Sequence, residues 1–225
     1  MKTLDILSML LIEGVGRRRI HRILSQYGED ELSMKDLKEV LHSKFSDICL
    51  IKMGNIYEKA KRVMEWAKKT DIDVIGFQED QFPHSLRNIP DPPVLLFIKG
   101  QYEFIHQENN CIGVIGTREP TEHGKNIAKL VGRYLAIKNF KVISGLASGC
   151  DTQAHLGSLE GGGKTAAVVA HGLNMIYPYE NKSLGEEIIS QGGCMISEYL
   201  PNDQPKNYTF IERDRIQSGL SKGVI

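Results

Sequence analysis

The chain has 225 residues, of which 41% are apolar, and 28 basic side chains balance 28 acidic ones. This composition is typical of a folded protein with one large or two modest domains, and it excludes an intrinsically disordered chain. A net charge of zero excludes a uniformly basic nucleic-acid-binding protein, so any recognition of an anion has to come from a local site.

The sequence indicates neither a membrane segment nor a metal site. No apolar run approaches the roughly 18 residues of a membrane helix, and the first residues lack the apolar core and cleavage site of a signal peptide. The four cysteines are far apart, with no CxxC pair and no Cys/His cluster at metal-ligand spacing. We therefore expect a cytoplasmic protein with reduced thiols, no metal, no cofactor and no membrane contact.

Residues 1–70 have a helical pattern. Apolar residues recur at helical spacing over 4–11, 20–24 and 37–41, and a last helix is predicted over 56–67. Between the first two helices, Gly14-Val15-Gly16 precedes three arginines. Such a turn is the core of a helix-hairpin-helix motif, whose free amides meet a DNA phosphate, but a plain helix–helix turn with a solvated basic face has the same pattern.

Residues 71–105 are predicted to form a connector, because prolines at this density forbid a helix. A short strand is predicted over 73–76, and an edge strand over 95–98.

Residues 106–225 alternate between strand and helix patterns. Strands are predicted over 112–116, 141–145, 165–170 and 194–198, and helices over 121–137, 151–159, 182–190 and from Arg213 onward. This alternation predicts an α/β fold, with a parallel sheet covered by helices on both faces. Such sheets bind ligands beyond the carboxyl ends of their strands.

The stretch Gly161-Gly162-Gly163-Lys164-Thr165 resembles the end of a phosphate-binding P-loop, but its context excludes that interpretation. A P-loop needs a glycine six residues before its lysine, and residue 158 is serine. The stretch also follows a predicted helix and leads into a predicted strand, the reverse of a P-loop. The glycines are better interpreted as a helix stop and a tight turn. Lys164 is then either a contact for an anion or a solvated side chain.

Two neighbouring strand ends have the composition of an anion or nucleotide site. Gly116-Thr117-Arg118 offers a close backbone approach, a hydroxyl and a bidentate cation. The loop from Ser144 to Asp151 contains Gly145, Ser148 and Gly149, and it can direct several amides toward a phosphate at a helix N-terminus.

Other polar and aromatic residues have two interpretations each. Asp151 and His155 share a helix face and could form an acid–base pair, or they could be a capping aspartate and a buried histidine. Tyr177 and Tyr179 could stack on bases or lie buried under a loop. No third partner that would complete a catalytic arrangement with Asp151 and His155 is evident in the sequence.

In order along the chain, these motifs resemble the DNA-processing protein A family, DprA/Smf. The resemblance rests on Gly116 to Arg118, on SGLASGCDTQAH from Ser144, on GGGKT, on GLNMIYPYEN from Gly172, and on RDRIQSGLS from Arg213. It covers about residues 72–225, and the N-terminal helices resemble the helix-hairpin-helix or SAM-like domain of that family. It implies a Rossmann-like, mostly parallel sheet that binds single-stranded DNA without catalysis. It also implies protection of incoming DNA and loading of a RecA-type recombinase in natural transformation.

The resemblance also implies which residues contact DNA. Arg118 and Lys164 match the basic contacts of the family, and the loop from Ser144 to Gly149 matches its phosphate-facing loop. The expected set is Gly116, Thr117, Arg118, Ser144, Gly145, Ser148, Gly149, Lys164, Arg213 and Arg215. This sequence departs from the family pattern at Ile211, Asp214 and Gln217, where the family has proline, asparagine and isoleucine.

Two further expectations follow from the resemblance. Family members continue beyond the position of Ile225 with the region that forms their homodimer, so we expect a fragment, a truncated product or a divergent member that lacks this region. The alternative function is a small-nucleotide-binding enzyme or sensor on a related scaffold, although the Pro-Gly-Gly-x-Gly-Thr motif of such enzymes is absent.

Overall fold

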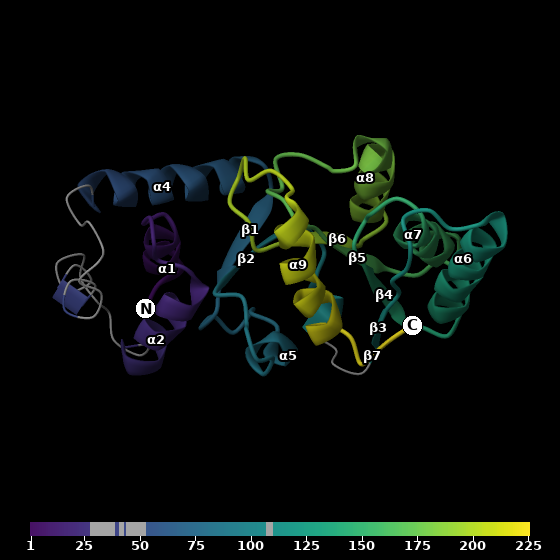
Figure 1. Cartoon of the computed structure of the whole chain (residues 1–225), viewed down its shortest axis with the longest axis horizontal. Coiled ribbons are helices and arrows are strands. Elements are labelled where there is room, and N and C mark those ends of the chain that lie inside the picture. The colour runs from purple at the N-terminus through teal and green to yellow at the C-terminus, as the bar shows by residue number, and fades with distance from the viewer. Residues whose placement is uncertain (28–38, 41–42, 44–52, 107–109) are drawn as a thin grey trace. The chain divides into compact units, whose positions relative to one another are not determined.

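A computed structural model describes residues 1–27, 39–40, 43, 53–106 and 110–225 (Figure 1). The chain divides into two compact units, one made of residues 1–82 and 93–96 and the other of residues 83–92 and 97–225. Within the described ranges, no helix combines the length and the apolarity that crossing a lipid bilayer requires.

The first unit contains three described helices and a strand: α1 (Thr3–Leu10), α2 (Arg17–Tyr27), α4 (Met53–Lys69) and β1 (Ile72–Gly76). Ile6, Leu7, Ile20 and Ile23 are fully buried, so the helical periodicity predicted from the sequence is confirmed over α1 and α2. The predicted helix over 37–41 falls mostly outside the described residues.

The turn between α1 and α2 has the geometry that its glycines allow. Gly14 has a φ of +83°, a conformation that favours glycine. Gly14, Gly16 and the three arginines that follow line a hollow of about 300 Å³. Contact between this turn and DNA stays a prediction.

The second unit carries most of the sheet and the helices that cover it. Its elements in chain order are α5 (His84–Arg87), β2 (Leu95–Gly100, which begins in the first unit), η2 (Glu103–His106), β3 (Cys111–Gly113), α6 (Glu122–Ile137), β4 (Lys141–Ser144), α7 (Cys150–Glu160), β5 (Thr165–Val168), η3 (Tyr179–Asn181), α8 (Lys182–Ser190), β6 (Cys194–Ser197), α9 (Asn207–Gly219) and β7 (Gly223–Val224).

The strand order is β1-β2-β6-β5-β4-β3-β7, and the neighbours from β6 to β7 are parallel, whereas β2 is antiparallel to β6. The predicted α/β fold with a mostly parallel sheet is therefore confirmed. The prediction that residues 95–98 form an edge strand is wrong, because β2 lies between β1 and β6. Every side chain from Val94 to Ile98 is buried, as is typical of an interior strand. Pro92 and Pro93 precede β2, which begins at Leu95.

Helices cover both faces of the sheet because the chain reverses direction across it. From β3 to β6 the strands are added in one direction, and right-handed crossovers then place α6, α7 and α8 on one face. The step from β6 to β7 runs the opposite way and places α9 on the other face (Figure 1). The helix predicted from Arg213 begins earlier, at Asn207.

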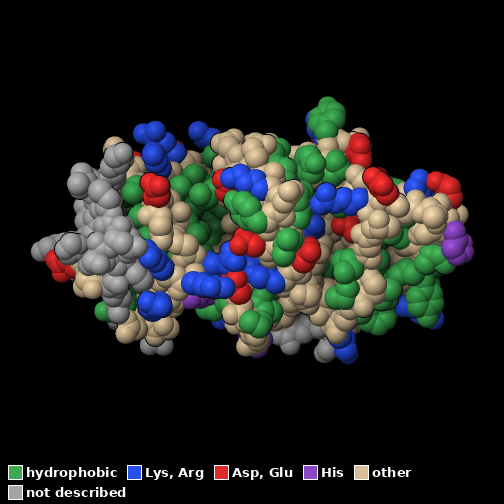
Figure 2. All heavy atoms as spheres, in the orientation of Figure 1, with side chains coloured by type: hydrophobic (Ala, Val, Ile, Leu, Met, Phe, Trp, Pro, Cys, Tyr) green, Lys and Arg blue, Asp and Glu red, His purple; other side chains and the backbone are tan. Residues whose placement is uncertain are grey.

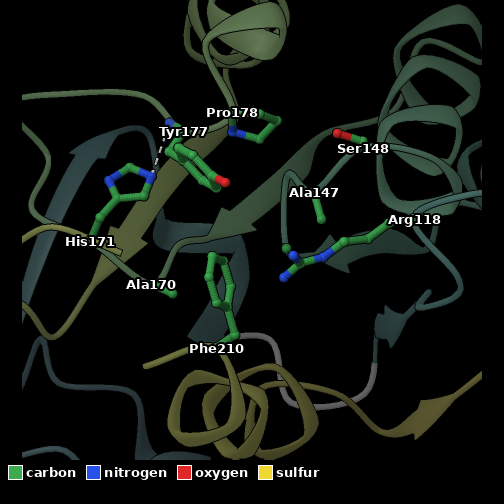
Figure 3. A pocket seen from close by; sticks show the side chains of 9 residues that line it. Arg118, Ala147, Ser148, Ala170, His171, Tyr177, Pro178 and Phe210 are labelled. Atoms are coloured by element: carbon green, nitrogen blue, oxygen red, sulfur yellow. Dashed lines mark hydrogen bonds between the residues drawn. The ribbon is translucent and has the colours of Figure 1, made fainter. Parts of the chain in front are cut away.

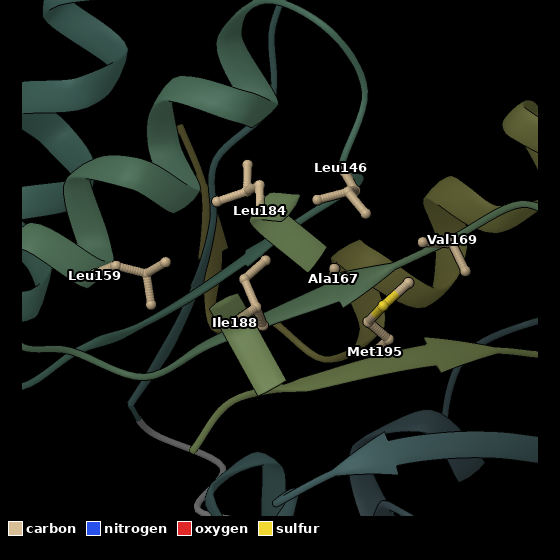
Figure 4. Close-up of a cluster of buried hydrophobic side chains, with 7 residues drawn as sticks. All are labelled: Leu146, Leu159, Ala167, Val169, Leu184, Ile188 and Met195. Atoms are coloured by element: carbon tan, nitrogen blue, oxygen red, sulfur yellow. The ribbon is translucent and has the colours of Figure 1, made fainter. Parts of the chain in front are cut away.

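The core under α7 and α8 is a compact cluster of aliphatic side chains that the sequence pattern anticipates (Figure 4). It consists of Leu146, Leu159, Ala167, Val169, Leu184, Ile188 and Met195. A second cluster under α6 contains Val114, Leu135, Val142 and Ala154. Both clusters place strand residues against helix residues, so they fix the helices to the strands whose ends carry the loops described next.

The pairing of α6 with α7 depends on glycine. A Cβ on Gly132 would overlap the carbonyl oxygen of Ala154, and a Cβ on Gly157 would overlap that of Lys129. Because the two backbones approach so closely, α6 buries small residues against α7. Four of its large apolar side chains remain exposed, namely Ile127, Leu130, Tyr134 and Ile137, whereas Leu135 is buried in the cluster under α6.

Candidate nucleic-acid interface

Two loops predicted to bind an anion meet at the carboxyl ends of the parallel strands. Arg118 follows β3, and the loop of Gly145 to Gly149 follows β4. The amide of Cys150 donates to the carbonyl of Thr117 at 3.1 Å. Gly149 has a φ of +84°, and a Cβ there would overlap the carbonyl oxygen of Thr117. Glycine at this position is therefore what allows the two loops to touch.

The exposed guanidinium of Arg118 lies over the ring of Phe210, 4.4 Å from its centroid (Figure 3). This is a cation–π contact between the end of β3 and the first turns of α9. The ring of Tyr177 is 6.1 Å from that of Phe210 and tilted by 47°. Among the described residues, no carboxylate lies within ion-pair distance of Arg118. The cation is thus oriented by an aromatic ring, and its charge also acts on the carboxyl of Asp214, where it opposes the rise in pKa that burial causes.

Two hollows flank the stack of Arg118 on Phe210. One, of about 50 Å³, is lined by Ser148, His171 and Tyr177 (Figure 3). The other, of about 350 Å³, is lined by Gly116, Asp151 and other residues of the strand ends. The stack therefore forms a ridge that an extended ligand can cross.

Exposed tyrosines also lie next to lysines in the segment before α8 and at the start of α9. Tyr177, Tyr179 and Tyr208 are 46%, 78% and 55% exposed. The ammonium of Lys182 lies 6.0 Å from the ring of Tyr179, and that of Lys206 lies 5.7 Å from the ring of Tyr208. We call Arg118, Tyr177, Tyr179, Lys182 and Phe210 the arginine–aromatic surface; Tyr208 is two positions before Phe210 on α9 and therefore points to a different side of that helix.

The glycine- and serine-rich loop is already occupied by a carboxylate of the chain. Asp151 accepts hydrogen bonds from the amides of Gly145 at 3.1 Å and Ala147 at 3.4 Å. Burial raises the pKa of Asp151, and the nearby charge of Arg213 opposes that shift. Ser144 is fully buried and donates to the carbonyl of Val114. The side chain of Ser144 and the amide of Gly145 are therefore engaged inside the protein.

Ser148 and Gly149 keep groups on the surface. The hydroxyl of Ser148 donates to Glu180 at 2.6 Å, in an exposed contact that a ligand can replace. Within the described chain, no group accepts a hydrogen bond from the amides of Ser148 and Gly149. Of the predicted loop residues, these two remain placed for a phosphate, together with Gly116 and Thr117, which are exposed beside Arg118.

Arg213 and Arg215, two predicted DNA contacts, are engaged inside the protein. Arg213 is buried, donates to the carbonyl of Val168 at 2.6 Å, and lies where a Cβ on Gly145 would be. Burial lowers its pKa, and Asp151 opposes that shift. Arg215 forms a two-bond ion pair with Glu198, at 2.7 and 2.6 Å. Both guanidinium groups are thus engaged with groups of the protein, although Arg213 also lines the hollow beside Arg118.

Lys164 does not lie with Arg118, and the prediction of one patch containing both is wrong. Lys164 comes immediately before β5, whereas Arg118 comes after β3, and β3, β4 and β5 are parallel. Lys164 therefore lies at the amino-terminal ends of these strands, and Arg118 lies at their carboxyl-terminal ends. The turn of Gly161 to Gly163 does follow a helix and lead into a strand, as predicted.

The buried histidine next to this surface is structural. His155 is fully buried, and its Nδ1 lies 2.7 Å from the hydroxyl of Thr165. Burial lowers the pKa of His155 to about 3, so the ring is neutral at pH 7. The carboxylate of Asp151 is directed to loop amides. The interpretation as a capping aspartate and a packed histidine is therefore the one that fits.

Sequence reasoning missed Phe210 and Lys182 as members of the surface. Phe210 stands 92 positions after Arg118, and no local pattern joins the two residues. An aromatic residue three positions before an arginine-rich helical segment was the available signal. It becomes informative only when the strand ends are in place.

Comparison with known proteins places this chain among characterised relatives. Residues 73–225 match the family model described as DNA recombination-mediator protein A. The DNA processing protein DprA of Bacillus subtilis is 37% identical over 169 residues, which cover 75% of this chain and 56% of that relative. The chain therefore spans just over half the length of that protein.

Two solved structures have the same fold. DNA processing protein A from Streptococcus pneumoniae aligns with all of this chain and 77% of its own, with a TM-score of 0.78 and 29% identity. DNA processing protein A from Helicobacter pylori, described with a single-stranded DNA binding mode, aligns with 68% of this chain and 67% of its own, with a TM-score of 0.60 and 27% identity.

Proposed function

We propose that this chain, which belongs to the DNA recombination-mediator protein A family, binds single-stranded DNA on the arginine–aromatic surface. The observation that carries the proposal is the stack of Arg118 on Phe210 at 4.4 Å, beside exposed tyrosines. Alternating cations and aromatic rings suit a flexible strand, because phosphates meet the cations and unpaired bases stack on the rings. Contacts of this kind are tolerant of sequence and sensitive to salt.

The finer parts of the proposal come from the family. They are a cytoplasmic location, protection of single-stranded DNA and its transfer to a RecA-type recombinase, with a homodimer only where the region that forms the family's dimer is present. No catalytic step is part of this function. The DprA relatives and the H. pylori structure, whose description names single-stranded DNA binding, support the proposal that this chain binds single-stranded DNA.

The alternative is a sensor or enzyme for small nucleotides, and the hollow of about 350 Å³ beside Arg118 favours it. That volume is near the lower limit for small-molecule sites. The buried pair of Asp151 and Arg213 already fills the polar end of the hollow. We favour the strand because the exposed tyrosines lie outside this hollow, along a path that a mononucleotide would not use.

The test is a fluorescence-anisotropy titration with oligo-dT, the matching duplex and mononucleotides as competitors. The proposal expects oligo-dT to bind more tightly than duplex, and Phe210→Ala to weaken oligo-dT binding by about 5- to 150-fold, since stacking contributes about 1–3 kcal/mol per base. Leu130→Ala, an exposed apolar side chain on α6, is the control. Displacement of oligo-dT by equimolar mononucleotide would favour the alternative.

A further inference from the structure

Three lysines occupy corresponding positions at the amino-terminal ends of the parallel strands. Lys141 begins β4 and is paired with Cys111 of β3. Val142 pairs with Thr165, so Lys164 is opposite Lys141. Ile112 pairs with Gly223, so Lys222 is opposite Cys111. We call Lys141, Lys164 and Lys222 the lysine row.

The row has a spacing that suits a polyanion. Adjacent strands are about 4.8 Å apart, so the row extends about 14 Å across β5, β4, β3 and β7. The sheet positions place all three residues on strand ends of one edge, opposite Arg118. Burial raises the pKa of the Cys111 thiol to about 11, and the charge of Lys141 opposes this shift. The ammonium of Lys141 therefore lies close to the middle of the row.

Two lysines of the row, Lys141 and Lys164, donate hydrogen bonds to neutral groups. The ammonium of Lys141 donates to the amide oxygen of Asn139 at 2.7 Å, and that of Lys164 donates to Gln101 at 3.1 Å. By contrast, Lys125 and Lys129 on α6 form ion pairs with Glu122 and Glu160. An amide oxygen orients an ammonium without cancelling its charge, so the row presents positioned cations.

One acidic side chain acts near the row, and an aromatic one lies beside it. Burial is the main cause of the raised pKa of the Cys194 thiol. The charge of Glu103 raises this pKa further, and the charge of Lys164 lowers it. Tyr134 on α6 is 61% exposed, with the ammonium of Lys138 5.8 Å from its ring. Figure 2 shows hydrophobic side chains over α6, with Lys and Arg side chains below them. The edge thus combines cations with an exposed ring.

We propose that the lysine row is a second contact surface for single-stranded DNA, reached by a strand that continues from the arginine–aromatic surface around the sheet. The inference rests on the proposed function. It assigns Lys164 to phosphate contact at the opposite edge from Arg118. An acidic protein segment would also be attracted by lysines, but a strand held on the arginine–aromatic surface already supplies the repeated phosphates that a second set of cations can bind.

The experiment compares two oligonucleotide lengths. Fluorescently labelled dT of about 6 nucleotides and of about 30 nucleotides lie near and beyond the limits of single-strand site sizes. Both are titrated at several salt concentrations against wild type, the triple variant Lys141→Gln/Lys164→Gln/Lys222→Gln, and Arg118→Ala. The double variant Lys125→Gln/Lys129→Gln is the matched control, because these lysines are paired with acids. Thermal melts establish that each variant is folded.

The inference expects an effect that depends on length. The triple variant should bind the short strand within about twofold of wild type, whereas for the long strand its log–log salt slope should fall by about 2, or about 0.7 for each of three lost phosphate contacts. Arg118→Ala should weaken binding of both strands. The control should match wild type with both.

Several outcomes would overturn the inference, and they separate it from the proposed function. A triple variant that binds the long strand with wild-type affinity and slope refutes the row as a DNA contact and leaves it to an acidic protein, while the proposed function stands. Equal weakening for both lengths refutes a separate second surface. If wild type binds neither strand, the proposed function and this inference fail together.

Discussion

Replacing Arg118 with alanine tests the site most directly, because the structure separates its role in folding from its role in binding. The guanidinium is exposed, and its described partner is the ring of Phe210, at 4.4 Å. An exposed cation–π contact is worth about 0.5–1 kcal/mol, so the free energy of unfolding should fall by no more than that. A variant that remains folded can therefore be compared with wild type in binding.

The loss in binding should be larger than the loss in stability. A hydrogen bond to a charged group contributes about 1.5–3 kcal/mol, so removal of one guanidinium–phosphate contact should weaken oligo-dT binding by about 10- to 150-fold. One lost phosphate contact should also lower the log–log salt slope by about 0.7. Both changes have one cause and should appear together.

The assay is an anisotropy titration of labelled oligo-dT at four salt concentrations, with Arg133→Ala as the control. Arg133 is an exposed arginine on α6 beside the turn of Gly161, which precedes β5, whereas Arg118 follows β3 at the other end of the parallel strands. Combining Arg118→Ala with Phe210→Ala should give a smaller loss than the sum of the two single losses, because each residue positions the other. Affinity within twofold of wild type and an unchanged salt slope for Arg118→Ala would refute the reasoning.

Three further predictions concern groups that the structure assigns to folding. Gly145→Ala should lower the free energy of unfolding in urea by about 1–3 kcal/mol, because its Cβ would overlap the guanidinium of Arg213. Gly223→Ala, with open space around its Cβ, should have little effect. Arg215→Ala should cost about 3 kcal/mol by leaving Glu198 unpaired, and the folded variant should bind oligo-dT like wild type; a tenfold loss of affinity would restore Arg215 as a contact. The folded-state pKa of His155 is lowered from 6.5 to about 3, so its stabilisation is present above pH 6.5 and is lost as pH falls toward 3, by about 1.4 kcal/mol per pH unit. His155→Phe should flatten that part of the stability curve between pH 6 and 4, and an identical slope in both proteins would exclude this cause.

Periodicity along the sequence was sufficient to predict the sheet and most helices of the second unit. The pattern over 182–190 coincides with α8, and the strand patterns begin within one residue of β3, β4, β5 and β6. Prolines misled the prediction for β2, since they mark where a strand begins and say nothing of its neighbours. Ile127, Leu130, Tyr134 and Ile137 of α6 are exposed because the close approach of this helix to α7 selects small side chains for burial between them.

The candidate site was predicted less completely, because charge and glycine content do not reveal which groups are already paired. Arg118 was predicted and lies on the surface, but Arg213, with the same chemistry, is enclosed by its own fold. Ser144 likewise donates to a backbone carbonyl. Residues that precede parallel strands and residues that follow them lie at opposite ends of those strands. Because Lys164 precedes β5, it lies at the end opposite to Arg118.

The carboxylate of Asp151 has a consequence for how quickly a ligand can be captured. By holding the amides of Gly145 and Ala147, it fixes the loop after β4 before any ligand arrives. Ordering that backbone would otherwise oppose association by about 1–2 kcal/mol per residue. Encounter should therefore be limited by diffusion and ionic attraction, with no slow rearrangement of the loop in the approach to equilibrium.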